Sequence, residues 1–144
     1  MSNKLLVAVD GSETGKRAIN FAAQAAKETS NSIILAYVIE WSPYSFHTPE
    51  ELAERHKRRE SEISRAEESI LAPEADELRS AGIEVETVVR HGHIGDTLSD
   101  IAREQDVSQI YIGRKGESKM HAMLFGSVTA SLIQTASVPV TVIP

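Results

Sequence analysis

Five short apolar segments, separated by stretches with helical spacing, constrain the fold of this chain more than any other feature. They are rich in Val and Ile, are bounded by Gly, Asp, Asn or Pro, and span residues 5–9, 32–39, 83–89, 109–112 and 138–143. Strands that are apolar along their whole length and alternate with helices indicate a parallel sheet, joined by right-handed crossovers and covered on both faces. We therefore predict one α/β domain over residues 1–144.

The stretches between the strands carry apolar side chains at helical spacing. The three clearest stripes are Ala18, Ile19, Ala22, Ala25 and Ala26; Leu98, Ile101 and Ala102; and Val128, Leu132, Ile133 and Ala136. The long stretch 49–81 is also helical, but Pro73 predicts a kink or a restart within it. Its first half is almost entirely charged. We interpret the basic run 56–59 as a solvated helix face, because acidic residues flank it on both sides.

The third and fifth strands have the features of sheet edges. The third alternates apolar and charged residues along most of its length, and Pro139 removes a backbone donor from the fifth. Because Val138, Val140 and Val142 share one face, we predict a homodimer that pairs through this last strand, residues 138–143. The alternative is that Pro139 and Pro144 protect the edge and keep the chain monomeric.

Charge and cysteine content exclude several classes of function. The chain has 15 Lys and Arg against 21 Asp and Glu, a net charge of −6, whereas nucleic-acid and anionic-membrane partners require a basic surface. Without cysteine there is no disulfide, thiol nucleophile or thiolate zinc site. The longest apolar run, 33–39, is too short to span a bilayer. We expect a cytoplasmic protein with no nucleic-acid partner and no membrane insertion.

The loop after the fourth strand is the best candidate for a ligand site, because ligands of open α/β sheets bind beyond the carboxyl ends of the strands. Here Gly113 and Gly116 bracket Arg114 and Lys115, and a further pair, Gly126–Ser127, opens the next helix. Glycines let backbone amides approach an anion, and a helix N-terminus supplies unpaired N–H groups. The basic side chains would provide most of the charge neutralisation.

Asp10, which follows the first strand, allows two interpretations. Its carboxylate can accept a hydrogen bond from a base or ribose hydroxyl, or it can cap the first helix, with Ser12 or Thr14 sharing that role. The run 11–17 looks like a phosphate-binding P-loop but lacks one spacer residue, so we interpret it as a turn entering a helix. His91 and His93 have no third metal ligand nearby in sequence, which favours loop histidines over a metal site.

The spacing Gly113-x-x-Gly116, nine residues, then Gly126–Ser127, together with the opening Val-Ala-Val-Asp-Gly-Ser of residues 7–12, resembles the universal stress protein family over the whole chain. The resemblance implies a Rossmann-like, five-stranded parallel sheet of order 3-2-1-4-5. It also implies the ATP-binding branch of the family, for which this glycine pattern is typical.

Transferred position by position, the resemblance implies a nucleotide site with no catalytic residue and no direct metal ligand. The adenine would lie near Ala8, Asp10, Val38 and Ile112, the ribose by Asp10 and Gly113, and the phosphates by Lys115, Gly116, Gly126, Ser127, Val128 and Thr129. Val9, Ser12 and Arg114 complete this set. The implied ligand is ATP, with AMP or ADP as alternatives, and Mg²⁺ or Mn²⁺ would be held through the phosphates.

Three functions of different classes follow from these observations. The leading hypothesis is a regulatory, ATP-binding module of the stress response, whose occupancy biases its conformation or dimerisation. The second is a dimeric interaction protein that binds no nucleotide, in which the glycines are only turn residues. The third is a slow ATP hydrolase or phosphotransferase, for which Asp10, Glu117 and His121 are the candidate base and metal-binding residues.

Overall fold

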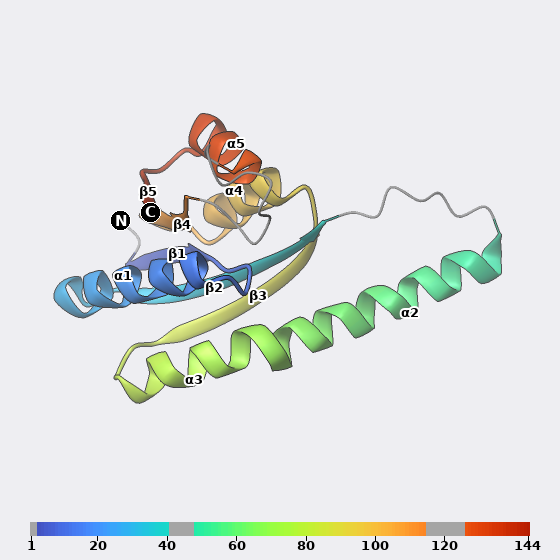
Figure 1. The fold of residues 1–144 in the computed structure, drawn as a ribbon, viewed down its shortest axis with the longest axis horizontal. Coiled ribbons are helices and arrows are strands. Elements are labelled where there is room, and N and C mark those ends of the chain that lie inside the picture. The colour runs from blue at the N-terminus through green and yellow to red at the C-terminus, as the bar shows by residue number, and fades with distance from the viewer. Residues whose placement is uncertain (1–2, 41–47, 115–125) are drawn as a thin grey trace.

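The computed structural model describes residues 3–40, 48–114 and 126–144. Its five strands form one sheet of order β3-β2-β1-β4-β5, and all four pairings are parallel, as predicted (Figure 1). The strands are β1 (Lys4–Ala8), β2 (Ser32–Glu40), β3 (Val85–Gly92), β4 (Gln109–Gly113) and β5 (Val140–Ile143). The helices are α1 (Glu13–Thr29), α2 (Pro49–Ala66), the π-helical turn η1 (Glu67–Leu71), α3 (Ala72–Ser80), α4 (Ile94–Glu104) and α5 (Ser127–Thr135).

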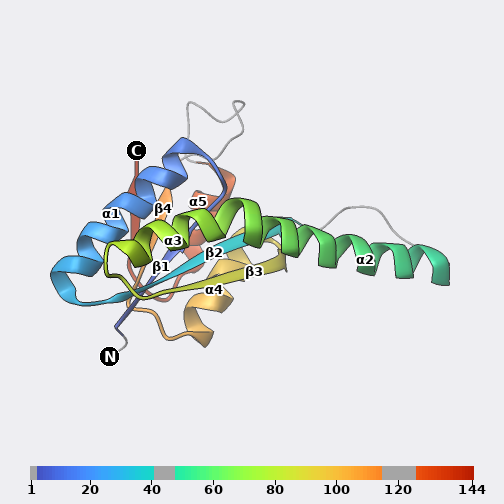
Figure 2. The same cartoon turned by 90° about the horizontal axis from the view of Figure 1, so that it is seen from below.

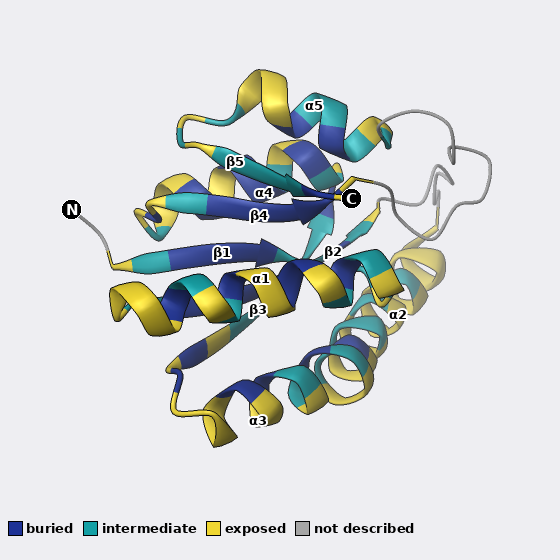
Figure 3. Cartoon of the chain, turned by 60° about the vertical axis from the view of Figure 1, so that its left-hand side comes forward, coloured by how far each residue is buried: buried dark blue, intermediate teal, exposed yellow. Residues whose placement is uncertain are grey.

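Helices cover both faces of the sheet, and the sheet divides the core into two halves. Helix α1 packs with η1 and α3 on one face, and α4 packs with α5 on the other (Figure 1). The alanine-rich stripe of α1 is turned toward the strands while its opposite side is exposed, which Figure 3 shows as alternating colours along the helix. The predicted stripes of α1 and α4 are therefore confirmed.

The charged helix α2 extends past the end of the sheet (Figures 1 and 2). Thr48 and Glu51 form a capping box at its start, and within α2 only Ala66 is buried. The basic run 56–59 lies on this solvated part, as expected. The predicted restart is also present: α3 begins at Ala72 with Pro73 in its first turn, directly after η1. A π-helical turn is one way for a helix to absorb such an interruption.

Two strand boundaries differ from the prediction. β3 begins two residues later than Ile83 and continues to Gly92, because its carboxyl half pairs with β2 as far as Glu40. His91 consequently lies in a strand and not in a loop. β5 begins at Val140 and not at residue 138, since Pro139 cannot donate to the ladder and contributes only its carbonyl, which accepts from Ile110 N–H at 2.9 Å.

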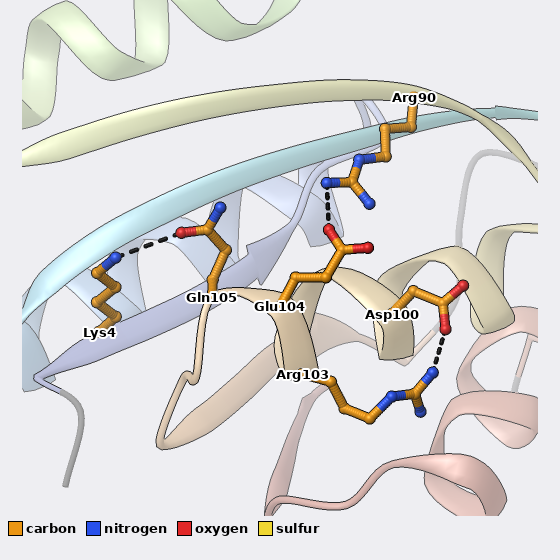
Figure 4. A network of polar contacts seen from close by, with 6 residues as sticks. All are labelled: Lys4, Arg90, Asp100, Arg103, Glu104 and Gln105. Carbon is orange, nitrogen blue, oxygen red and sulfur yellow. Dashed lines mark hydrogen bonds and ion pairs between the residues drawn. The ribbon is translucent and has the colours of Figure 1, made fainter.

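Polar contacts join α4 to the sheet and stabilise its outer surface (Figure 4). Arg90 of β3 forms an ion pair with Glu104 at 2.5 Å, and Lys4 of β1 donates to Gln105 at 3.3 Å. Arg103 and Asp100 pair within the helix. These contacts are partly or fully exposed, so we attribute the position of α4 mainly to its buried apolar stripe.

The stripe predicted for α5 is only partly correct. Leu132 is fully buried, but Ile133 is 46% exposed and Ala136 lies beyond the end of the helix. We expect Leu132→Ala to lower the free energy of unfolding by about 2–5 kcal/mol, because it leaves a cavity between α5 and the sheet. Ile133→Ala is the matched control and should cost much less. Urea unfolding measures both, and equal losses would contradict the assignment of the buried face.

Candidate functional site

A cavity of about 450 Å³ opens at the carboxyl ends of the strands, where the strand order reverses between β1 and β4. This is the position at which open α/β sheets bind ligands, and the volume lies within the usual range for small-molecule sites. Residues from β1, β2, β4, α1, α4 and α5 form its walls: Ala8, Val9, Asp10, Gly15, Ala36, Tyr37, Val38, Ile39, Glu40, Ile94, Leu98, Ile112, Gly113, Gly126, Ser127, Val128 and Thr129.

One side of the cavity is an apolar slot. It is lined by Val38 of β2, Ile112 of β4, and Ile94 and Leu98 of α4, and all but Ile94 are buried. An apolar slot of this kind suits a flat ring system, because burying the ring faces removes apolar surface from water.

The N-terminus of α5 forms another part of the cavity wall. Gly126 is its N-cap residue and carries no side chain that caps the first turn. The N–H groups of Ser127, Val128 and Thr129 precede the first intrahelical bond, which Ala130 donates to Gly126 at 3.0 Å. Gly126 has φ −56°, a value open to any residue, so backbone conformation does not require glycine there.

Two hydrogen bonds hold this helix end against β4. The Thr129 hydroxyl donates to the Gly113 carbonyl at 2.8 Å in a buried position, and Gly126 N–H donates to the Arg114 carbonyl at 3.0 Å. The helix terminus is thus fixed beside the end of the strand, with its positive dipole end toward the cavity.

Asp10 and Ser12 divide the two roles that the sequence left open. Ser12 is the N-cap of α1, since its hydroxyl oxygen accepts from Gly15 N–H at 3.0 Å. Oδ1 of Asp10 accepts from the Ser12 N–H at 3.0 Å and from the Ser12 hydroxyl, which holds the turn. Within the described part of the chain, Oδ2 of Asp10 has no hydrogen-bond partner. Asp10 therefore orients the capping residue and keeps one acceptor at the cavity.

The backbone of Val38 is also directed toward the cavity. The β1–β2 ladder ends with the bond from Val9 N–H to the Ala36 carbonyl at 2.8 Å. Alternate residues of a strand point their backbone polar groups to the same side, so the N–H and C=O of Val38 face the space that β1 leaves as it turns into α1. They form an adjacent donor and acceptor beside the apolar slot.

Most of the residues expected at the nucleotide site come together around this cavity: Ala8, Val9, Asp10, Val38, Ile112, Gly113, Gly126, Ser127, Val128 and Thr129. Ser12 and Arg114 do not line the cavity. Arg114 is exposed and directly follows the wall residue Gly113 in the chain. The expectations for Lys115 and Gly116, and for Glu117 and His121, fall outside the described residues.

Sequence reasoning did not assign the remaining wall residues: Gly15, Ala36, Tyr37, Ile39, Glu40, Ile94 and Leu98. The position of Glu40 directly after the second strand was a usable signal. The apolar wall residues of β2 and α4 gave no such signal, because an apolar residue that lines a cavity cannot be distinguished in sequence from one in the core.

The histidines flanking Gly92 lie apart from the cavity walls. Nε2 of His91 lies 3.0 Å from an oxygen of Glu62, which joins β3 to α2, and His93 is the N-cap residue of α4. In residues 3–40, 48–114 and 126–144, no group of three or more His, Asp or Glu side chains is arranged to hold a metal ion. The same residues contain no helix long and apolar enough to cross a membrane.

The fold and the cavity define an open α/β domain with a candidate ligand site, and comparison with known proteins identifies its family. The model of the universal stress protein family matches residues 1–144, and the chain belongs to that family. The universal stress protein YxiE of Bacillus subtilis is 27% identical over 99% of this chain and 99% of its own length. Rv1996 of Mycobacterium tuberculosis is 30% identical over 97% of this chain but 47% of its own length, so the chain spans about half of that relative.

Solved structures share the fold. UspA from Lactobacillus plantarum superimposes with a TM-score of 0.83 at 22% identity, over 98% of this chain and 97% of that one. A universal stress protein from Archaeoglobus fulgidus in complex with dAMP gives 0.67 at 22% identity, over 100% and 98%. A universal stress protein in complex with cAMP gives 0.66 at 23% identity, over 97% and 94%.

Gly113 has a packing role that can be separated from ligand binding. A Cβ at this position would lie 2.6 Å from Cγ2 of Thr14 in α1. We expect Gly113→Ala to lower the free energy of unfolding by about 1–3 kcal/mol, because β-branched Thr14 cannot easily move aside. Adding Thr14→Ala should recover part of this loss. A double-mutant cycle in urea measures the coupling, and strictly additive losses would mean that the two residues do not interfere.

Proposed function

We propose that this protein is a regulatory adenine-nucleotide-binding module of the stress response, with ATP as its expected ligand and AMP or ADP as alternatives. The observation that carries the proposal is a single cavity that joins an apolar slot to an uncapped helix N-terminus. Such a cavity matches a ligand with a flat ring at one end and an anion at the other. Occupancy would then bias the conformation or the dimerisation of the module.

The phosphate end is supported by the geometry of α5. Its first three N–H groups face the cavity without a capping side chain, and backbone amides at a helix N-terminus are a ready site for phosphate. Lys115 and Gly116 belong to the same proposed site. Mg²⁺ or Mn²⁺ would enter with the phosphates, since the described residues supply no metal-binding cluster of their own.

The base and ribose ends are supported by Val38 and Asp10. Adenine presents an acceptor, N1, beside a donor, N6, and the adjacent N–H and C=O of Val38 complement that edge. The open Oδ2 of Asp10 is an acceptor for a ribose hydroxyl. Two structural neighbours carry adenine monophosphates, dAMP and cAMP, which supports an adenine nucleotide in the present cavity.

Gly126→Asp tests the proposal without damaging the fold. The new carboxylate can accept from the first turn of α5, so the unliganded protein should be as stable as the wild type, or more stable by a few tenths of a kcal/mol. The same carboxylate occupies and repels the proposed phosphate position. Isothermal titration with Mg·ATP should therefore detect binding to the wild type and a loss of at least about 100-fold in the variant.

Asn20→Asp is the control for added charge, because Asn20 is exposed on α1 and does not line the cavity. It should leave ATP affinity within about twofold, as expected for a screened surface charge. Unchanged affinity in a folded Gly126→Asp protein would remove the helix terminus from the site. No heat of binding with ATP, ADP or AMP in the wild type would reject the proposal, and the interaction-protein hypothesis would replace it.

We further propose a homodimer through β5, although for a different reason than the sequence suggested. Val138, Val140 and Val142 pack against the core beside α4 and α5 and are already partly buried. Within the part of the chain that the structure describes, the edge of β5 has unpaired backbone groups that a second copy can bind. Pro139 and Ile143 direct their carbonyls to β4, so the intervening Val140 and Val142 point their N–H and C=O groups away from the sheet. Sedimentation velocity at 50 µM (roughly the range for a weak dimer) should give a dimer, and a monomer at this concentration would contradict it.

A further inference from the structure

Glu40 stands at the outer end of the apolar slot. It is the last residue of β2, and its side chain lies on the same face as those of Ala36 and Val38, because side chains alternate along a strand. Ala36 and Val38 are buried, whereas Glu40 is exposed. Along β2 the wall of the cavity therefore changes from apolar at Val38 to anionic at Glu40, two residues further on.

In the described part of the chain, the carboxylate of Glu40 has neither a hydrogen-bond partner nor an ion-pair partner. Arg90, on the adjacent strand, is engaged with Glu104 at 2.5 Å and points toward α4 (Figure 4). Asp10 is the other acidic residue of the described cavity wall, and it already holds the turn before α1. Among the described residues, the side chain of Glu40 holds no such turn, and Glu40 contributes to the fold through the backbone pairing of β2 with β3.

The direction of β2 relates Glu40 to the ligand's amino group. Along the strand, the N–H of Val38 comes before its C=O, and Glu40 is the next residue whose polar backbone faces the same side. A base that accepts at N1 from the Val38 N–H and donates from N6 to the Val38 carbonyl has used one N6 hydrogen. The second N6 hydrogen then points onward along the strand, toward Glu40.

We infer that Glu40 is a specificity-determining residue that selects an unsubstituted 6-amino group on the purine. Its carboxylate accepts a hydrogen bond from the second N6 hydrogen. A purine whose 6-amino group is alkylated lacks that hydrogen and is therefore disfavoured. A hydrogen bond to a charged acceptor is stronger than a neutral one, and an alkyl group in place of the second N6 hydrogen cannot donate it. This inference rests on the proposed function and extends it to the base.

A cycle that combines variants with ligands tests the inference. Isothermal titration with Mg·ATP and with Mg·N6-methyl-ATP should show that the wild type prefers ATP by about tenfold or more. In Glu40→Ala the two ligands should bind within about threefold of each other, and Glu40→Gln, whose amide oxygen still accepts, should recover part of the preference. Removing the Glu40 charge affects both ligands equally through their identical phosphates, so this effect cancels in the ratio of the two dissociation constants.

Glu86→Ala is the matched control, since it removes an exposed carboxylate from β3 outside the cavity. It should keep the full preference for ATP. A preference that is unchanged in Glu40→Ala, or absent from the wild type, overturns the role of Glu40 while the proposed function stands. Failure of the wild type to bind ATP, ADP or AMP overturns the proposed function and this inference with it.

Discussion

The site depends on one constraint: the segments that follow the neighbouring strands β1 and β4 lead to helices on opposite faces of the sheet. After β1 the chain turns into α1 on one face, and α5, which follows β4 in the described chain, covers the other. Two neighbouring strands whose helices leave in opposite directions open a space between them at their carboxyl ends. The Asp10–Ser12 hydrogen bonds hold one side of this space, and the bond from Thr129 to the Gly113 carbonyl holds the other.

The cavity combines groups that suit different parts of one ligand. Its apolar walls come from β2, β4 and α4, its amide donors from α5, and its acidic groups are Asp10 and Glu40. An acidic protein of net charge −6 has little general attraction for an anion, so in the proposed nucleotide site local backbone geometry would have to carry much of the recognition. This is consistent with a site that works through positioned N–H groups and a few charges, rather than through a basic surface.

Much of the architecture was predictable because the period of apolar residues decides helix or strand, and the sheet is buried on both sides. The alanine stripe of α1 follows directly from that period, and the edge position of the last strand follows from Pro139, which cannot donate to a ladder. Errors arose where tertiary contacts decide. Pairing with β2 extends β3 to Gly92, and Ile133 is exposed although its spacing suggested a core position. Among the glycines, sequence suggested close approach to a ligand at Gly113, and the fold adds the contact with Thr14.

The sequence by itself determined the class of fold, the order of its elements and the residues that follow each strand, because these depend on local periodicity and on turn chemistry. Only the tertiary structure decided which of those residues share a cavity. It also decided that Ser12 caps α1 while Asp10 keeps an acceptor open, and that Glu40 stands in line with Val38. The shared cavity joins residues far apart in the chain, from Ala8 to Thr129, so it arises only when the sheet brings its carboxyl ends to one edge, whereas the contacts of Ser12 and Asp10 are local and depend on the turn geometry that the fold imposes.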